Sequence, residues 1–304
     1  VVFGGGKSPV PNVAFTEEWT GAGAQIGAWS TGGSLNTGRY YVGHAGTQTA
    51  GLAVGGENPS GSLDVTELYD GTSWTEVSDL TVGKAASGSN GTQTSALVYG
   101  GDIPADTAQT ESWNGTNWTE TTDLNQSRRL LAGAGADNTN ALAFGGYVSG
   151  NYALTESWNG SNWTETGDLN TAKRNLGGLG STNTAVLAVG GLTTTTVAET
   201  EFFNGTNWTE LNDLNSARTF AATAGNAPAA GLAFSGNPAP GVGTRTEDWN
   251  GISWQETSDL STARDAAGGT GTSTAALAFG GNPGAMTTTE EWSVPSSTIK
   301  VLTD

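Results

Sequence analysis

The residues of this 304-residue chain best suited to chemistry are cations that follow acids at a fixed spacing. Five aspartates each precede a lysine or arginine by five residues: Asp79 and Lys84, Asp123 and Arg128, Asp168 and Lys173, Asp213 and Arg218, Asp259 and Arg264. Arg39, Arg129 and Arg174 share this phase. Because guanidinium groups bind carboxylates in bidentate fashion, the pattern predicts either an anion-binding ring or a structural tie between each cation and its aspartate. The repetition favours the tie.

Carboxylates recur in two further series. The first comprises Glu67, Glu111, Glu156, Glu201, Glu247 and Glu290, and the second comprises Glu120, Glu165 and Glu210. Paired carboxylates are typical of glycosidases, which need two of them at a defined separation. A residue repeated in every unit is better explained by the design of that unit than by one active site. We therefore expect no enzymatic activity, with a glycosidase or lyase as the last alternative.

Metal and cofactor sites are not expected. The chain has no cysteine and a single histidine, His44, which excludes thiolate and multi-histidine metal centres. His44 is better explained as a residue that lines a channel or that lies in the core with its hydrogen bonds satisfied.

The aromatic residues divide into two groups. All eleven tryptophans fall on two recurring positions, so packing between repeated units accounts for every one of them. Four tyrosines lie off these positions and are better ligand candidates: Tyr40, Tyr41, Tyr147 and Tyr152.

A 45-residue repeat positions all these side chains. Its marks are double glycines or close variants at residues 4–5, 55–56, 100–101, 145–146, 190–191, 235–236 and 280–281, the first spacing being six residues longer. Within a repeat, an apolar run ends at the double glycine and a variable loop follows. Short runs rich in threonine and tryptophan then flank an Asn-Gly turn, as in Asn159-Gly160. Such runs, bounded by Gly, Asn or Asp, predict four short antiparallel strands and essentially no helix.

Four strands in each 45-residue unit, repeated along the whole chain, predict a β-propeller. The order of apolar strand, Gly-Gly, loop, aromatic residue, short turn, Trp, acidic-Leu and Arg resembles the kelch repeat of galactose-oxidase-like propellers. The resemblance covers residues 1–304 as one domain and implies arginines near one mouth of the channel that hold acidic peptides. The copper site of galactose oxidase has no counterpart here, since it requires cysteine and several histidines.

The marks predict seven blades. The strand before the double glycine and the strand with the third-position aromatic each occur seven times, whereas the innermost strand occurs six times. We therefore expect an N-terminal blade, beginning at Val1 and including Trp19 and Trp29, that lacks its inner strand. Its unpaired edge is where strand addition by a partner is expected. Because the chain begins with Val1, we expect a processed or excised product.

Variation along the repeat predicts the binding face. The loops between second and third strands differ from blade to blade and share a face with the cation-bearing crossovers, whereas the Asn-Gly turns lie opposite. We predict that a ligand binds on the variable-loop face. The candidate residues are Arg39, Tyr40, Tyr41, Arg128, Arg129, Tyr147, Tyr152, Arg174, Arg218 and Arg264.

Composition limits the partners. A net charge of −18 argues against nucleic acid and anionic membranes, and no apolar run is long enough to cross a bilayer. We expect a non-enzymatic interaction or structural module, exposed on a virus particle such as a phage appendage or in an extracellular assembly. Its partners would be protein subunits of that assembly. A carbohydrate-binding propeller that recognises a surface glycan is the alternative.

Overall fold

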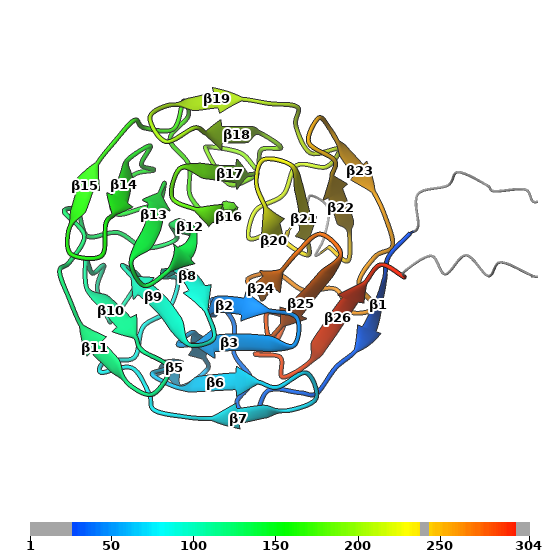
Figure 1. Ribbon diagram of the computed structural model, residues 1–304, viewed down its shortest axis with the longest axis horizontal. Helices are drawn as coiled ribbons and strands as arrows, with labels where there is room; N and C mark the ends of the chain where they lie inside the picture. The colour runs from blue at the N-terminus through cyan, green and yellow to red at the C-terminus, as the bar shows by residue number, and fades with distance from the viewer. Residues whose placement is uncertain (1–25, 238–242, 296–304) are drawn as a thin grey trace, which may run out of the picture.

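Six four-stranded antiparallel sheets stand around a central axis in the computed structural model, which describes residues 26–237 and 243–295 (Figure 1). None of the described residues is helical, so none forms a helix that could cross a membrane. The innermost strands β2, β8, β12, β16, β20 and β24 surround the axis, and each sheet runs outward from it. The predicted all-β propeller of four-stranded blades is confirmed.

The blades are numbered from the N-terminal side, and their strands are given from the axis outward. Blade 1 holds β2 (Gly43–Thr47), β3 (Ala50–Val54), β6 (Thr66–Tyr69) and β7 (Trp74–Glu76). Blade 2 holds β8 (Gly88–Thr92), β9 (Ser95–Tyr99), β10 (Thr110–Trp113) and β11 (Trp118–Glu120). Blade 3 holds β12 (Ala132–Asp137), β13 (Asn140–Phe144), β14 (Thr155–Trp158) and β15 (Trp163–Glu165).

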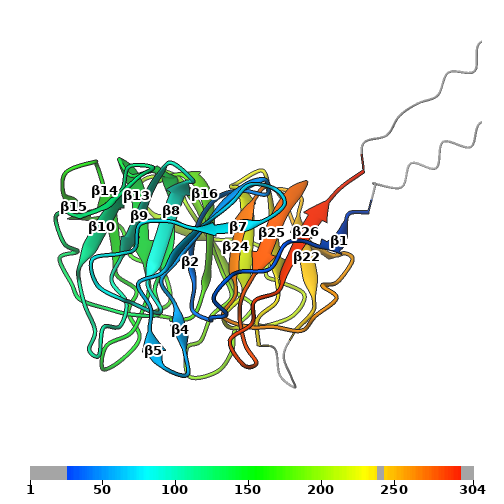
Figure 2. The same ribbon diagram turned by 90° about the horizontal axis from the view of Figure 1, so that it is seen from below.

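The second half of the ring repeats this arrangement. Blade 4 holds β16 (Gly177–Thr182), β17 (Ala185–Val189), β18 (Thr200–Phe203) and β19 (Trp208–Glu210). Blade 5 holds β20 (Ala222–Asn226), β21 (Ala230–Phe234), β22 (Thr246–Trp249) and β23 (Trp254–Glu256). Blade 6 holds β24 (Gly268–Gly271), β25 (Ala275–Phe279), β26 (Thr289–Ser293) and β1 (Ala28–Thr31). A small ribbon of β4 (Glu57–Asn58) and β5 (Gly61–Ser62) projects from one face (Figure 2).

The double glycine ends each second strand because the chain turns there in the left-handed region. Gly190 has φ +62°, and a Cβ on it would lie 2.5 Å from the carbonyl oxygen of Arg218. Ser235 adopts the equivalent conformation in blade 5, at φ +60°. The glycine mark therefore reports both backbone conformation and a close approach of the next crossover.

Tryptophans join neighbouring blades. The indole N–H of each fourth-strand tryptophan donates a hydrogen bond of 3.0–3.2 Å to a threonine at the start of the preceding blade's third strand. The pairs are Trp29 and Thr246, Trp74 and Thr289, Trp118 and Thr66, Trp163 and Thr110, Trp208 and Thr155, Trp254 and Thr200. Within the described residues, the prediction that the tryptophans serve packing between blades is confirmed.

The prediction of seven blades is wrong: the described residues form six. Strand β1, which we assigned to a separate N-terminal blade, pairs with β26 as the outermost strand of blade 6, with Trp29 opposite Trp292. The first segment and the last blade thus share one sheet, and repeat marks cannot show this because the pairing joins residues more than 250 positions apart. The six innermost strands and the six fourth-strand tryptophans give the correct number.

The remaining N-terminal marks, Phe3-Gly4-Gly5 and Trp19, lie outside the described residues. All six described blades have four strands, so the N-terminal blade predicted to lack its inner strand is not among them. The unpaired edge at which we expected strand addition belongs to the segment that begins at Val1, and that segment lies outside the described part of the chain.

Candidate functional site

The repeated cations lie inside the blades. Each of them forms an ion pair with the glutamate of its own blade's third strand. The pairs are Arg39 and Glu67 (2.5 Å), Lys84 and Glu111 (2.9 Å), Arg128 and Glu156 (2.5 Å), Lys173 and Glu201 (2.8 Å), Arg218 and Glu247, and Arg264 and Glu290 (2.8 Å). Burial lowers the pKa of Arg39, Arg218 and Arg264, and the glutamates oppose this shift.

The prediction that an aspartate pairs with each of these cations is wrong. Asp79 instead accepts a hydrogen bond from the backbone N–H of Thr66 at 3.1 Å, and the aspartates of blades 2 to 5 do the same. The spacing in sequence identified the right residue types, but strand pairing brings the third-strand glutamate closer. Arg39, Arg128, Arg218 and Arg264 have no exposed surface, so a ligand in solvent cannot reach these four candidates.

The two glutamate series form pairs that repeat with the blades. Glu111 and Glu120 are opposite each other in the pairing of β10 and β11, and the same pairing recurs in blades 1, 3, 4 and 5. The first member of each pair is buried on its cation, and the second is exposed. The ion pair of each buried glutamate with its cation connects the crossover to the sheet. The described residues contain no cluster of three or more metal-ligating side chains.

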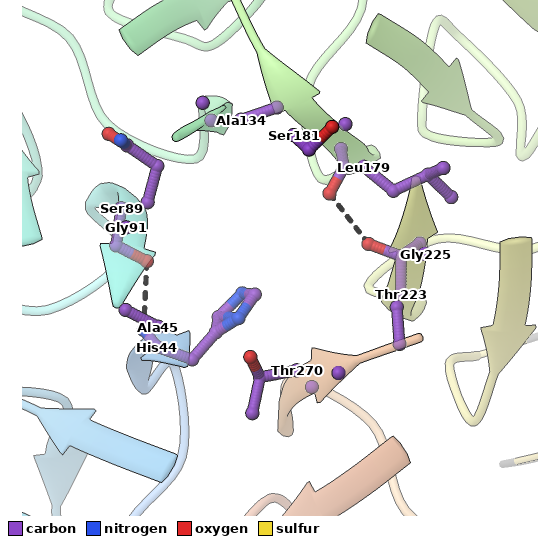
Figure 3. A pocket seen from close by; sticks show the side chains of 18 of the residues that line it. His44, Ala45, Ser89, Gly91, Ala134, Leu179, Ser181, Thr223, Gly225 and Thr270 are labelled. Atoms are coloured by element: carbon purple, nitrogen blue, oxygen red, sulfur yellow. Dashed lines mark hydrogen bonds between the residues drawn. The ribbon is translucent and has the colours of Figure 1, made fainter. Parts of the chain in front are cut away.

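A channel runs along the axis. Its main cavity, of about 250 Å³, is lined by residues of the innermost strands, most of them small, and the polar side chains in this lining include His44, Ser89 and Thr223 (Figure 3). The Ser89 hydroxyl accepts a hydrogen bond from the backbone N–H of His44 at 2.8 Å. Burial lowers the pKa of His44 to about 4, so its ring is neutral at pH 7. The channel wall is thus largely uncharged.

One mouth of this channel is a cup made by the residues that precede the innermost strands. It has a volume of about 100 Å³, and His44 lies at its inner end. Six equivalent positions form its wall, each with φ between +50° and +57°: Tyr41, Ala86, Leu130, Asn175, Phe220 and Ala266. We call these six residues the axial cup. The Tyr41 N–H donates to the Ala266 carbonyl, and the Phe220 N–H donates to the Asn175 carbonyl.

The axial cup unites one predicted residue, Tyr41, with five that we did not predict. A signal was present, because each cup residue follows the repeated cation by two positions. The Tyr41 ring lies 5.2 Å from Tyr40 and 5.4 Å from Phe220, which makes one side of the mouth aromatic. Burial raises the pKa of Tyr41, and the carboxylates of Asp265 and Glu57 raise it further.

Three other predicted residues meet beside the axial cup. The guanidinium groups of Arg174 and Arg129 lie 4.5 Å and 5.7 Å from the centre of the Tyr147 ring, and Arg129 and Tyr147 are bridged through their backbones. We call Arg129, Tyr147 and Arg174 the arginine rim. Tyr152 belongs to the same loop and is half-buried, but it makes no ring contact with the rim. The rim belongs to blades 3 and 4, across the ring from Asp265 and Glu57.

The two rim arginines differ in their partners. Arg129 forms ion pairs with Asp102 at 3.0 Å and with Asp106 at 3.2 Å. Arg174 donates to the side-chain oxygen of Asn151 at 2.7 Å and, among the described residues, pairs with no carboxylate. Its charge is therefore the more available of the two for an anionic ligand.

Comparison with known proteins adds no family to this geometry. No protein-family model matches the chain, and no curated protein matches it. The kelch-type resemblance therefore rests on the order of residues within the repeat.

Proposed function

We propose that this β-propeller is a non-enzymatic interaction module that binds a protein partner through its variable-loop face, centred on the axial cup and the arginine rim. One observation carries the proposal. The ion pairs, Trp–Thr bonds and glycine turns repeat from blade to blade, whereas the six equivalent cup positions hold tyrosine, alanine, leucine, asparagine, phenylalanine and alanine. Repetition is explained by scaffold stability, and divergence at one mouth by recognition.

The distribution of charge supports an acidic group on the partner. Nine cations lie in the described residues, and six of them are buried in blade ion pairs. The other three are Arg129, Arg174 and Arg245, two of which form the arginine rim. In a chain of net charge −18, this rim is a localised positive site that would orient an anionic group.

The setting we propose is an exposed component of a virus particle or an extracellular assembly. A chain with no cysteine and a surface rich in Thr, Ser, Asn and Gly is indifferent to redox conditions, which suits such a location. The partners would be protein subunits of that assembly, and a surface glycan is the alternative ligand.

A displayed random-peptide library tests the proposal. We expect enriched peptides that lose binding to Tyr147→Ala and Arg174→Glu, two changes on the variable-loop face, but bind normally to Asn207→Asp in an exposed turn of the opposite face. Peptides sensitive only to Asn207→Asp would contradict the proposal. Hits on a glycan array to which every blade contributes would replace the proposal with the carbohydrate-binding propeller. Substrate turnover that depends on one unrepeated carboxylate would replace it with the enzyme.

A further inference from the structure

The cavity of the axial cup is small, and no charged side chain lines it. Its volume of about 100 Å³ is below the ~150 Å³ of a cavity that holds a benzene ring, so a slender side chain fits it and an aromatic one does not. Among the described residues that line it, only Tyr41 and His44 can ionise, and both are neutral at pH 7. The charged groups of the mouth, such as Arg174 and Asp265, lie outside this lining.

Asn175 presents an unused hydrogen-bond donor to the cup. The residue lines the cavity and is only 7% exposed. Its side-chain oxygen is fully buried, whereas its side-chain nitrogen keeps some accessible surface and donates to none of the described residues. The nitrogen is thus the end of this amide that a ligand can reach.

His44 adds a second polar group at the inner end of the cup. Its ring projects into the channel (Figure 3), and the residue borders both the cup and an inner cavity of about 70 Å³. The ring nitrogens make no hydrogen bond with any described residue, and neither of them is fully buried. Because a neutral imidazole carries one donor and one acceptor, the inner end of the cup offers both.

The backbone of the cup is also incompletely paired. The six cup residues form a circle in which four N–H groups donate to the carbonyl of a neighbouring cup residue, at 2.7–3.0 Å. Within the described residues, the N–H groups of Ala86 and Ala266 have no acceptor, and the carbonyls of Tyr41 and Phe220 have no donor. The circle therefore leaves two donors and two acceptors unused.

These unused groups favour an uncharged polar ligand. A carboxylate would enter a cup whose lining holds no cation, and an ammonium group would enter one whose lining holds no anion, so either would lose its hydration without gaining a counter-ion. An apolar side chain would displace water from the unused donors and acceptors and would supply no hydrogen bond in return. A carboxamide carries no charge and has two N–H donors and an acceptor oxygen, which matches both kinds of unused group.

We propose that the axial cup binds the carboxamide side chain of a glutamine or asparagine of the partner protein. The carboxamide oxygen accepts a hydrogen bond from the side-chain nitrogen of Asn175, and the carboxamide NH₂ group donates inward to the acceptor nitrogen of His44. This inference rests on the proposed function and adds the chemistry of one group on its partner. The arginine rim lies beside the cup and takes no part in this contact.

An NMR titration tests the inference, because the only histidine of the chain reports directly on the cup. The signal is the Cε1–H resonance of His44 in the untagged protein at pH 7. The probes are acetyl-glutamine N-methylamide and three matched compounds that carry glutamate, norleucine or lysine in place of glutamine. We expect the glutamine probe to shift the signal saturably and to bind about tenfold more tightly than each of the other three, because these lose hydrogen bonds or bury an uncompensated charge.

A variant identifies the donor. Asn175→Leu should weaken binding of the glutamine probe about tenfold and should bind the norleucine probe at least as well as the wild type does. It is expected to fold, because Leu130 occupies the equivalent position at φ +56°. The control is Arg245→Gln, which changes an exposed arginine outside the cup and should bind the glutamine probe like the wild type.

The inference is overturned if the glutamine probe causes no saturable shift of the His44 signal, if any of the other three probes binds as tightly, or if Asn175→Leu binds the glutamine probe like the wild type. Each of these results leaves the proposed function intact when library peptides still bind the variable-loop face through Tyr147 and Arg174. If no library peptide binds that face, the proposed function fails, and the inference about its partner fails with it.

Discussion

Because β1 closes the ring, its contacts distinguish a six-bladed propeller from a seven-bladed one. The Trp29 indole donates to the Thr246 hydroxyl at 3.0 Å, and its ring centre lies 4.9 Å from Phe234 and 5.5 Å from Trp292. In a seven-bladed ring, Trp29 would lie in a different blade from Trp292 and would not reach Thr246. Coupling between positions 29 and 246 therefore reports closure.

The magnitude follows from these contacts. Trp29→Ala should lower the free energy of unfolding by about 2–3 kcal/mol, below the ~3–5 kcal/mol typical of a fully buried aromatic residue, because Trp29 is only partly buried. The hydrogen bond by itself is measured by a double-mutant cycle of Trp29→Phe and Thr246→Val, for which we expect a coupling of about 1 kcal/mol. Urea unfolding at pH 7 is the assay.

The matched control is the same pair inside the chain, Trp163→Phe with Thr110→Val, where the bond is 3.2 Å. If this control shows a coupling near 1 kcal/mol while the Trp29 cycle is additive within ~0.3 kcal/mol, β1 does not close the ring.

A second measurement uses the cysteine-free background. Ser30 is opposite Glu291, so Ser30→Cys with Glu291→Cys should form a disulfide, seen as a shift on a non-reducing gel.

Three further predictions concern stability. Arg128→Met leaves Glu156 buried without its cation and should cost about 3–5 kcal/mol in urea unfolding; a loss below ~1 kcal/mol would show that the pair is not desolvated. Gly190→Ala should cost about 2 kcal/mol or more, because its Cβ meets the Arg218 carbonyl at a left-handed φ, and an unchanged melting temperature would contradict that geometry. His44 has a folded-state pKa of about 4 against 6.5 in the unfolded chain, so the unfolded state binds the proton first and stability falls as pH decreases between these values. The free energy of unfolding that is lost on acidification should be smaller in His44→Gln than in the wild type, by up to about 3 kcal/mol. Identical free energies of unfolding for the two proteins at both pH 7 and pH 4.5 would refute this prediction.

Much of the fold was predictable from the sequence because a blade is a local structure. Its turns, apolar strands and tryptophans lie within 45 residues of one another, and each has a chemical signature such as Asn159-Gly160 or Gly190-Gly191. The repeated cations were also recognised as structural, although their partner was misassigned. Asp123 is nearer to Arg128 in sequence than Glu156 is, but the pairing of strands decides which carboxylate reaches the guanidinium.

The candidate site was less predictable. Tyr41 and Tyr147 were identified because they depart from the repeat, and Arg129 and Arg174 because they share the phase of the repeated cations. The structure places Tyr41 in the axial cup and holds both arginines over Tyr147 beside it. Leu130, Asn175 and Phe220 were missed because each is unremarkable within its own blade. They become a site only when six crossovers meet at the axis.

The sequence by itself determined the blade: its four strands, the glycine turns that end them, and the tryptophans that pack one blade on the next. Tertiary structure decided the number of blades and the identity of the cup. Both depend on closing a ring, in which β1 pairs with β26 and equivalent positions from six repeats converge on one axis. Such contacts join residues that are far apart in the chain, so no local pattern of residue types records them.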